Sequence, residues 1–315
     1  MKNFGIRVLL FTVIGLILYA GVYWWSETLV YKYGEENRFF KVKDADFIEY
    51  DYVILGSSHA MPFTFKDMKE QIQQKTDTKI INLSMPGAGV VLNRLIIEYF
   101  LTRHKTKNIL YVLDSFIFYS RMWNEGERIE DVDLYRRAPF DPVLARLLLS
   151  YSVKRGVNIK VALNYISGFV KINNHDRFKP DIPEDEESFE KNYEPTERVD
   201  KERIDYLYPE EVNKDLFNKY IQEFIQMIEY LQSEKIEVMV IKTPLRKEFY
   251  ELIPNEERFN NEIKEVLDKY DVAFYDFTLV CNKEEYFYNP DHLNREGMLC
   301  FLENHLKEVL INHRD

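Results

Sequence analysis

The stretch DYVILGSSHA, residues 51 to 60, decides the fold of this 315-residue chain. Its first half is a short β-branched apolar run ending in glycine, which is typical of a buried strand followed by a tight turn. Two serines and a histidine follow that turn directly. In parallel sheets ligands bind outside the carboxyl ends of the strands, so this turn is a candidate for chemistry.

Four more runs of the same kind predict strands: KIINLS (79 to 84), NILYVLD (108 to 114), IEVMVIKTP (236 to 244) and VAFYDF (272 to 277). Helical patterns are expected at roughly 63 to 75, 89 to 103, 213 to 234, 255 to 269 and 295 to 311. Strands that alternate with helices predict an α/β fold with a parallel, doubly wound sheet.

An uncharged, mostly apolar run of 18 residues extends from Val8 to Trp25, with Lys2 and Arg7 before it and Glu27 after it. As a helix rising about 1.5 Å per residue, it just spans a hydrocarbon core of roughly 30 Å. The charge asymmetry predicts a cytoplasmic N-terminus and a main domain in the periplasm or cell exterior. A cleaved signal peptide is the alternative, but bulky residues rather than an A-x-A-like site follow the run.

The expected organisation is an anchor over 1–26, a linker over 27–50 and an α/β domain over 51–315. The stretch at about 119–212 interrupts the alternation, and residues 181 to 211 carry 13 acidic and 4 basic side chains. A solvated, partly disordered loop explains that composition. A lid or a partner-docking segment is the other interpretation, since long insertions in α/β enzymes often cover the site.

Composition excludes several classes of protein. With 42 Lys+Arg against 53 Asp+Glu, the formal charge of -11 gives no basic surface for nucleic acid. The two cysteines, Cys281 and Cys300, could form a disulfide outside the cytoplasm or remain two buried thiols. Neither belongs to a His/Cys cluster, so no metal is expected.

Polar motifs follow three of the predicted strands: GSSHA (56 to 60), NLSMPGAG (82 to 89) and NPDHLN (289 to 294). Serine needs a neighbouring imidazole to take its proton, and the imidazole needs a third group to fix its tautomer. A tetrahedral oxyanion needs backbone N–H donors, which glycine allows to come close. Together the motifs predict a serine acyl-transfer site that uses no cofactor.

The order and spacing of these motifs resemble blocks I, II and V of the SGNH (GDSL-type) hydrolase superfamily. In that resemblance Ser58 is the nucleophile, Gly87 the oxyanion glycine of block II and His292 the general base. The resemblance implies a flavodoxin-like three-layer α/β/α sandwich. It covers roughly residues 50 to 115 and 213 to 311.

Two positions depart from the family pattern. The family motif is D-x-x-H, and this chain has Asn289 at the position of the aspartate. Asp291 directly precedes the histidine, so either residue could orient His292. The block III motif G-x-N-D is missing, and Ser115 after the third strand is the candidate for the unassigned oxyanion donor. Taken singly, each motif has a plain structural explanation, such as a turn or a helix cap. His59 is expected to pack or to bond locally.

The resemblance implies an ester hydrolase or O-acyltransferase that forms an acyl-enzyme on Ser58. Anchored proteins of this kind modify envelope polymers, which implies an envelope polysaccharide as substrate and a membrane-bound O-acyltransferase as partner. A catalytically degenerate protein that binds glycan or scaffolds an envelope assembly is the alternative, favoured by Asn289 and the missing block III. An esterase exported by a cleaved signal is a third possibility.

Overall fold

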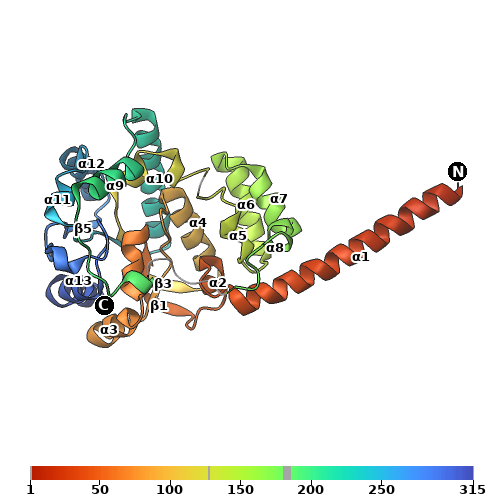
Figure 1. Ribbon diagram of the computed structural model, residues 1–315, viewed down its shortest axis with the longest axis horizontal. Coiled ribbons are helices and arrows are strands. Elements are labelled where there is room, and N and C mark those ends of the chain that lie inside the picture. The colour runs from red at the N-terminus through yellow and green to blue at the C-terminus, as the bar shows by residue number, and fades with distance from the viewer. Residues whose placement is uncertain (1, 127, 180–185, 315) are drawn as a thin grey trace. The chain divides into compact units, whose positions relative to one another are not determined.

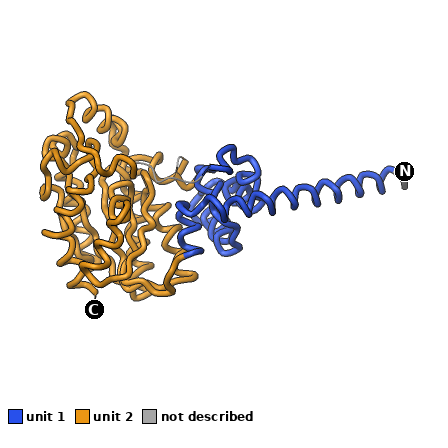
Figure 2. Tube along the Cα trace, turned by 60° about the horizontal axis from the view of Figure 1, so that its bottom comes forward, with its two compact units in different colours: residues 1–44, 130–182 blue, residues 45–129, 183–315 orange. Residues whose placement is uncertain are grey.

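The computed structural model describes residues 2–126, 128–179 and 186–314. The chain divides into two compact units, coloured separately in Figure 2. Unit 1 comprises residues 1–44 and 130–182, and unit 2 comprises residues 45–129 and 183–315. The predicted insertion is therefore shared between the units, and its residues 180–185 lie outside the described part.

Unit 2 contains a five-stranded sheet in which every neighbouring pair is parallel. Its strands are β1 (Glu49–Leu55), β2 (Ile80–Asn82), β3 (Lys105–Val112), β4 (Glu237–Lys242) and β5 (Ala273–Asp276). The order β2-β1-β3-β4-β5 is the flavodoxin-like order, whose switch point lies between β1 and β3. All five predicted strands are confirmed, each to within three residues at either end.

Helices cover both faces of this sheet, which confirms the three-layer α/β/α sandwich (Figure 1). On one face lie α4 (Val90–Leu101), α10 (Lys214–Ser233) and α12 (Glu256–Lys269), and on the other α3 (Met68–Thr76), α13 (Arg295–Phe301) and α14 (Lys307–Asn312). Tyr111 of β3 meets Phe224 of α10 with ring centroids 5.0 Å apart. On the opposite face Ile54 shares a buried cluster with Ile72 and Phe301. Because helices cover both faces, β1, β3 and β4 each contain a continuous apolar run, as the sequence indicated.

The predicted helices differ from the observed ones in two places. The helix expected at 63 to 75 begins at Met68, because a 3₁₀ helix, η1 (Ser58–Thr64), with Pro62 inside it precedes the helix. The helix expected at 295 to 311 is interrupted by a π-helical turn, η6 (Leu302–Leu306). Unit 2 is completed by η2 (Ser115–Phe118), η3 (Arg121–Trp123), η4 (Glu186–Ser188), α9 (Glu197–Leu207), α11 (Lys247–Tyr250) and η5 (Glu284–Tyr286).

Helices are the only regular secondary structure among the described residues of unit 1. It contains α1 (Lys2–Tyr33), α2 (Arg38–Lys43), α5 (Asp133–Arg136), α6 (Pro142–Arg155), α7 (Ile159–Ser167) and α8 (Phe169–Ile172). The segment Phe4–Tyr33 has a mean hydropathy of 2.1 in its most apolar window, which is exposed, so it is long and apolar enough to cross a membrane. A signal sequence has the same properties. Residues 27–50, expected as a linker, hold the end of α1, all of α2 and the first residues of β1.

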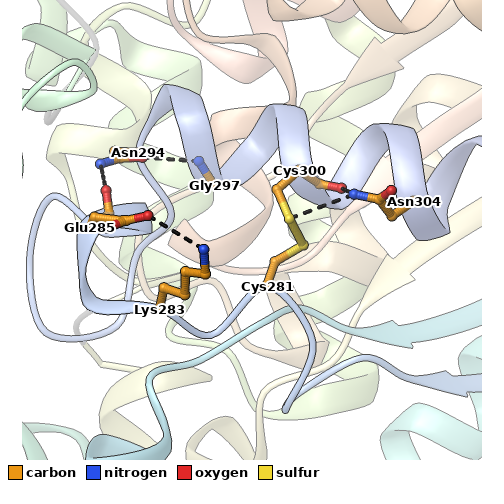
Figure 3. Close-up of a disulfide and its surroundings, with 7 residues drawn as sticks. All are labelled: Cys281, Lys283, Glu285, Asn294, Gly297, Cys300 and Asn304. Atoms are coloured by element: carbon orange, nitrogen blue, oxygen red, sulfur yellow. Dashed lines mark hydrogen bonds and ion pairs between the residues drawn. A yellow bond between two sulfur atoms is a disulfide. The ribbon is translucent and has the colours of Figure 1, made fainter.

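The two cysteines form a disulfide, drawn in Figure 3, with an S–S distance of 2.09 Å. It closes a loop that contains the 289 to 294 motif and ties the segment after β5 to α13. Within that loop the Asn294 side chain caps α13 by accepting the Gly297 N–H at 3.0 Å and donates to the Glu285 carbonyl at 2.7 Å. The motif is therefore held at both ends.

Removing this cross-link lowers the stability of unit 2. A separation of 19 residues corresponds to a loop-closure contribution of about 3 kcal/mol. We expect the double variant Cys281→Ser/Cys300→Ser to lose that much unfolding free energy in urea titrations of the full chain in detergent. Reductant should destabilise the wild type equally and leave the variant unchanged. A wild type whose unfolding free energy is the same with and without reductant would contradict the assignment.

Candidate functional site

The turn after β1 presents Ser57 and Ser58 at the carboxyl edge of the sheet, beside the switch point. Gly56 has φ +144°, and a Cβ there would lie 2.7 Å from the Val112 carbonyl oxygen, so the tight turn requires glycine. Ser57 is buried and its hydroxyl donates to Asp114. Ser58, the first residue of η1, is partly exposed.

Asn93 joins the first two turns of the site, and the sequence analysis did not identify it. Its Oδ1 accepts the Gly56 N–H at 3.1 Å, and its Nδ2 donates to the carbonyls of Ala88 and Gly89 at 3.0 Å each. The side chain is fully buried in α4. The only sequence signal was an amide on the apolar stripe of a helix.

Gly87 occupies the second turn in a left-handed conformation, with φ +60°. A Cβ at this position would lie 2.6 Å from the Trp123 ring, so a larger residue would displace that ring. The Gly87 carbonyl accepts from Arg128 Nε at 3.0 Å. Its N–H donates to no group among the described residues.

The third motif holds His292 in one orientation. The imidazole Nδ1 lies 2.9 Å from Asn289 Oδ1 and 3.0 Å from Asp291 Oδ1, so both residues proposed to orient the base reach the same nitrogen. Asn289 Oδ1 also accepts the backbone N–H groups of Asp291 and His292. A proton on Nδ1 leaves the Nε2 lone pair free, and Nε2 is buried without a hydrogen-bond partner within the described structure.

A second histidine, His59, lies against the first. Its Nδ1 lies 2.5 Å from Asp114 Oδ1, a residue 55 positions away, and its ring centroid is 4.6 Å from that of His292. The His59 Nε2 comes within 3.3 Å of Asp291 Oδ2 but is not aligned for a hydrogen bond. His59 therefore connects the carboxylate after β3 with the carboxylate of the histidine motif.

The two imidazoles carry different charges. Burial lowers the pKa of His59, but Asp114 and then Asp291 outweigh it and raise the pKa to about 10, so this ring is cationic at pH 7. Burial also lowers the pKa of His292. Here burial outweighs Asp291, which acts to raise that pKa, so this ring is neutral. Burial opposes ionisation of Asp291 as well, yet the histidines and Arg203 hold its pKa well below the usual range.

Part of the acidic insertion covers the site. Helix α9 places Arg203 on Asp291, with Nε 3.1 and 2.9 Å from the two carboxylate oxygens. Arg246, fully buried, joins Asp200 of α9 at 2.6 Å to the Pro290 carbonyl at 3.2 Å. In this part of the stretch, α9 is therefore an ordered helix that packs against the site through Arg203 and Asp200.

The hydroxyl of Ser115, the candidate oxyanion donor, is engaged elsewhere. It donates to Glu256, which also pairs with Lys242, and it lies 2.8 Å from the Tyr208 hydroxyl. Its single hydroxyl proton is therefore directed at a carboxylate. Ser115 and Tyr208 line a small cavity that also reaches His59 and Asp114.

Three groups near the centre could hold a cation. His59, Asp291 and His292 each offer a ligand atom, all within 4.8 Å of one another and buried. Carboxylates on the far nitrogens of both rings resemble the outer partners of metal-bound histidines. The cationic state of His59 competes with this role, because a metal ligand must be unprotonated.

No family model and no curated protein matches this chain. Similar solved structures include a "putative acylhydrolase" from Bacteroides fragilis, 8% identical with a TM-score of 0.42 over 86% of this chain and 90% of that one. Another is a "putative platelet activating factor" from Streptococcus pneumonia, 12% identical with a TM-score of 0.41 over 95% and 99%. Both the sequence identities and the TM-scores are low.

The charge on His59 makes stability depend on pH. Below pH 6.5 the imidazole is protonated in folded and unfolded chains alike, so its contribution is complete. Between 6.5 and about 10 only the folded chain keeps the proton, so stability falls as pH rises. We expect the unfolding free energy of wild type to decrease more between pH 6 and pH 9 than that of His59→Gln. Parallel pH dependences in urea titrations would contradict this.

Proposed function

We propose that this protein is a membrane-anchored serine ester hydrolase or O-acyltransferase that works outside the cytoplasmic membrane on an envelope glycan or a related polymer. The observation that carries the proposal is the state of His292. It is neutral, held through Nδ1, and its Nε2 is buried without a partner among the described residues. That is the state a general base needs before it takes a proton from serine.

In the proposed reaction Ser58 is the nucleophile and His292 the general base. The Ser58 hydroxyl gives its proton to His292 Nε2 while Oγ attacks the carbonyl carbon of the ester. The N–H of Gly87 donates to the oxyanion, and Asp291 stabilises the imidazolium. The intermediate then expels the alcohol, which takes the proton from His292 and leaves an acyl-Ser58 ester. Water or an acceptor hydroxyl attacks that ester by the reverse sequence, giving hydrolysis or transfer respectively.

The remaining parts of the proposal concern location and partners. An apolar N-terminal helix with positive charge before it, together with a disulfide in the main domain, supports placement outside the cytoplasm. By analogy with anchored envelope proteins, a membrane-bound O-acyltransferase would supply the acyl group and a polysaccharide would receive or lose it.

A second candidate function is a degenerate SGNH-fold protein that binds glycan or scaffolds an envelope assembly. The observation that favours it is the absence of a hydrogen bond between Ser58 and His292 among the described residues. Nucleophile and base are often poorly aligned before substrate binds, so the geometry is compatible with both candidates.

The adjacent serines provide a matched test. We expect Ser58→Ala and His292→Ala to abolish labelling by a fluorophosphonate and to lower hydrolysis of an activated acetyl ester roughly 10³-fold or more. Ser57→Ala should keep labelling within a few-fold, because Ser57 only donates to Asp114. Each variant is measured as the full chain in detergent, after circular dichroism has shown that it is folded.

Three outcomes separate the possibilities. Labelling lost only in Ser57→Ala would identify Ser57 rather than Ser58 as the nucleophile. A folded wild type that neither labels nor hydrolyses would favour the binding or scaffold protein. Hydrolysis abolished by EDTA, restored by Zn²⁺ and insensitive to Ser58→Ala would assign the His59, Asp291 and His292 cluster to a cation.

A further inference from the structure

Unit 1 exposes an apolar surface that its own fold does not cover. On α6 the exposed residues are one turn apart, and on α7 they recur at four and three residues, which places them on one stripe of each helix. We call this surface the α6–α8 face, and it consists of Leu149, Val153, Ile159, Leu163, Ile166 and Phe169. Helix α7 packs against both α6 and α8, so the three helices form one small bundle (Figure 1).

The face adjoins the membrane helix at a defined level. Tyr19, Tyr23 and Glu27 lie on one side of α1, and all three contact α8 or the two residues just before it. Tyr19 donates to the Ser167 carbonyl at 2.9 Å. The Tyr23 ring lies where a Cβ of Gly168 would be, only 2.2 Å from its ring carbons.

A buried ion pair completes this attachment. Lys171 Nζ lies 2.5 Å from Glu27 Oε2, and the lysine side chain is fully buried. Burial lowers the pKa of Lys171, and Glu27 opposes that shift, so the pair is a specific and costly contact that fixes α8 against α1. The level of the α6–α8 face along α1 is therefore set by the fold.

That level lies inside the apolar run. Tyr19 is six residues before Trp25, the last residue of the uncharged stretch, which corresponds to about 9 Å along a helix. If α1 crosses a bilayer with that stretch in the hydrocarbon, Ile166 and Phe169 flank it at the outer interface. Exposed apolar side chains at this depth meet lipid.

Charge agrees with a lipid surface. Residues 142 to 172 contain five Lys+Arg and no Asp or Glu, although the whole chain carries a net charge of -11. Lys154 and Lys160 are exposed beside the turn between α6 and α7. Basic side chains around an apolar face are typical of helices that lie in an anionic membrane interface.

We propose that the α6–α8 face inserts into the outer leaflet of an anionic bilayer beside α1, so that unit 1 holds the protein at the membrane through two contacts. The proposal uses the membrane anchoring given under the proposed function and is independent of the chemistry at Ser58. The occupant is lipid, and a transmembrane helix of a partner protein is the outcome that the test must distinguish.

The test places a single environment-sensitive fluorophore on the full chain in vesicles of phosphatidylcholine and phosphatidylglycerol. The labelled variants are Leu163→Cys on the face, Leu16→Cys in α1 as the insertion control, and Val212→Cys in unit 2 as the matched exposed control. The native cysteines are paired and stay unlabelled without reductant. Unfolding curves confirm that each labelled chain remains folded.

We expect the label at 163 to emit at shorter wavelength than the label at 212 and to be quenched several-fold more strongly by doxyl lipids. Replacing Lys154 and Lys160 by glutamate, or omitting phosphatidylglycerol, should weaken that quenching. If the label at 163 emits as in water while the label at 16 is quenched by doxyl lipids, the proposal is overturned. The face would then be assigned to a partner helix. A blue-shifted label that lipids do not quench would also overturn it, because protein would then cover the face. An aqueous label at 16 would overturn the anchor together with this inference.

Discussion

The carboxylate of Asp291 is the group on which the candidate site depends. Taking a carboxylate out of water costs several kcal/mol unless its oxygens are paired, and this one is paired with Arg203 and lies between two imidazoles. The charges of Asp291, Arg203, Asp114 and the cationic His59 sum to zero. Removing any one member would leave a buried charge uncompensated, so the four groups stabilise one another as a set.

This balance explains how two histidines only 4.6 Å apart take different roles. His59 sits between two carboxylates and keeps a proton, whereas His292 shares one carboxylate and an amide and loses it. A cation beside His292 disfavours a second proton on the pair, since like charges repel. The cationic ring therefore helps to keep the other ring neutral. Two similar groups in different environments have different pKa values, so one site can hold both a proton acceptor and a fixed charge.

Much of the fold could be predicted because its signals are local. Apolar runs bounded by turn residues located every strand, and alternation with helices gave the parallel sheet. The three motifs were found because parallel strands end at one edge. The partners that set charge were missed, because Asp114 meets His59 across 55 residues and Arg203 meets Asp291 across 88, and no spacing encodes such contacts. The division of the insertion between two units was missed for the same reason.

Helix α9 and His292 are linked through the same carboxylate. Arg203 belongs to α9, whereas Asp291 belongs to the loop that orients His292. If α9 moved away from the loop, Asp291 would lose a bidentate partner. The two imidazoles would then supply more of the positive charge that balances it. A protonated His292 would then be favoured, and a protonated histidine cannot accept the serine proton. The contact of Arg203 with Asp291 thus favours the neutral form of His292, so the same carboxylate links α9 to the charge state of that imidazole.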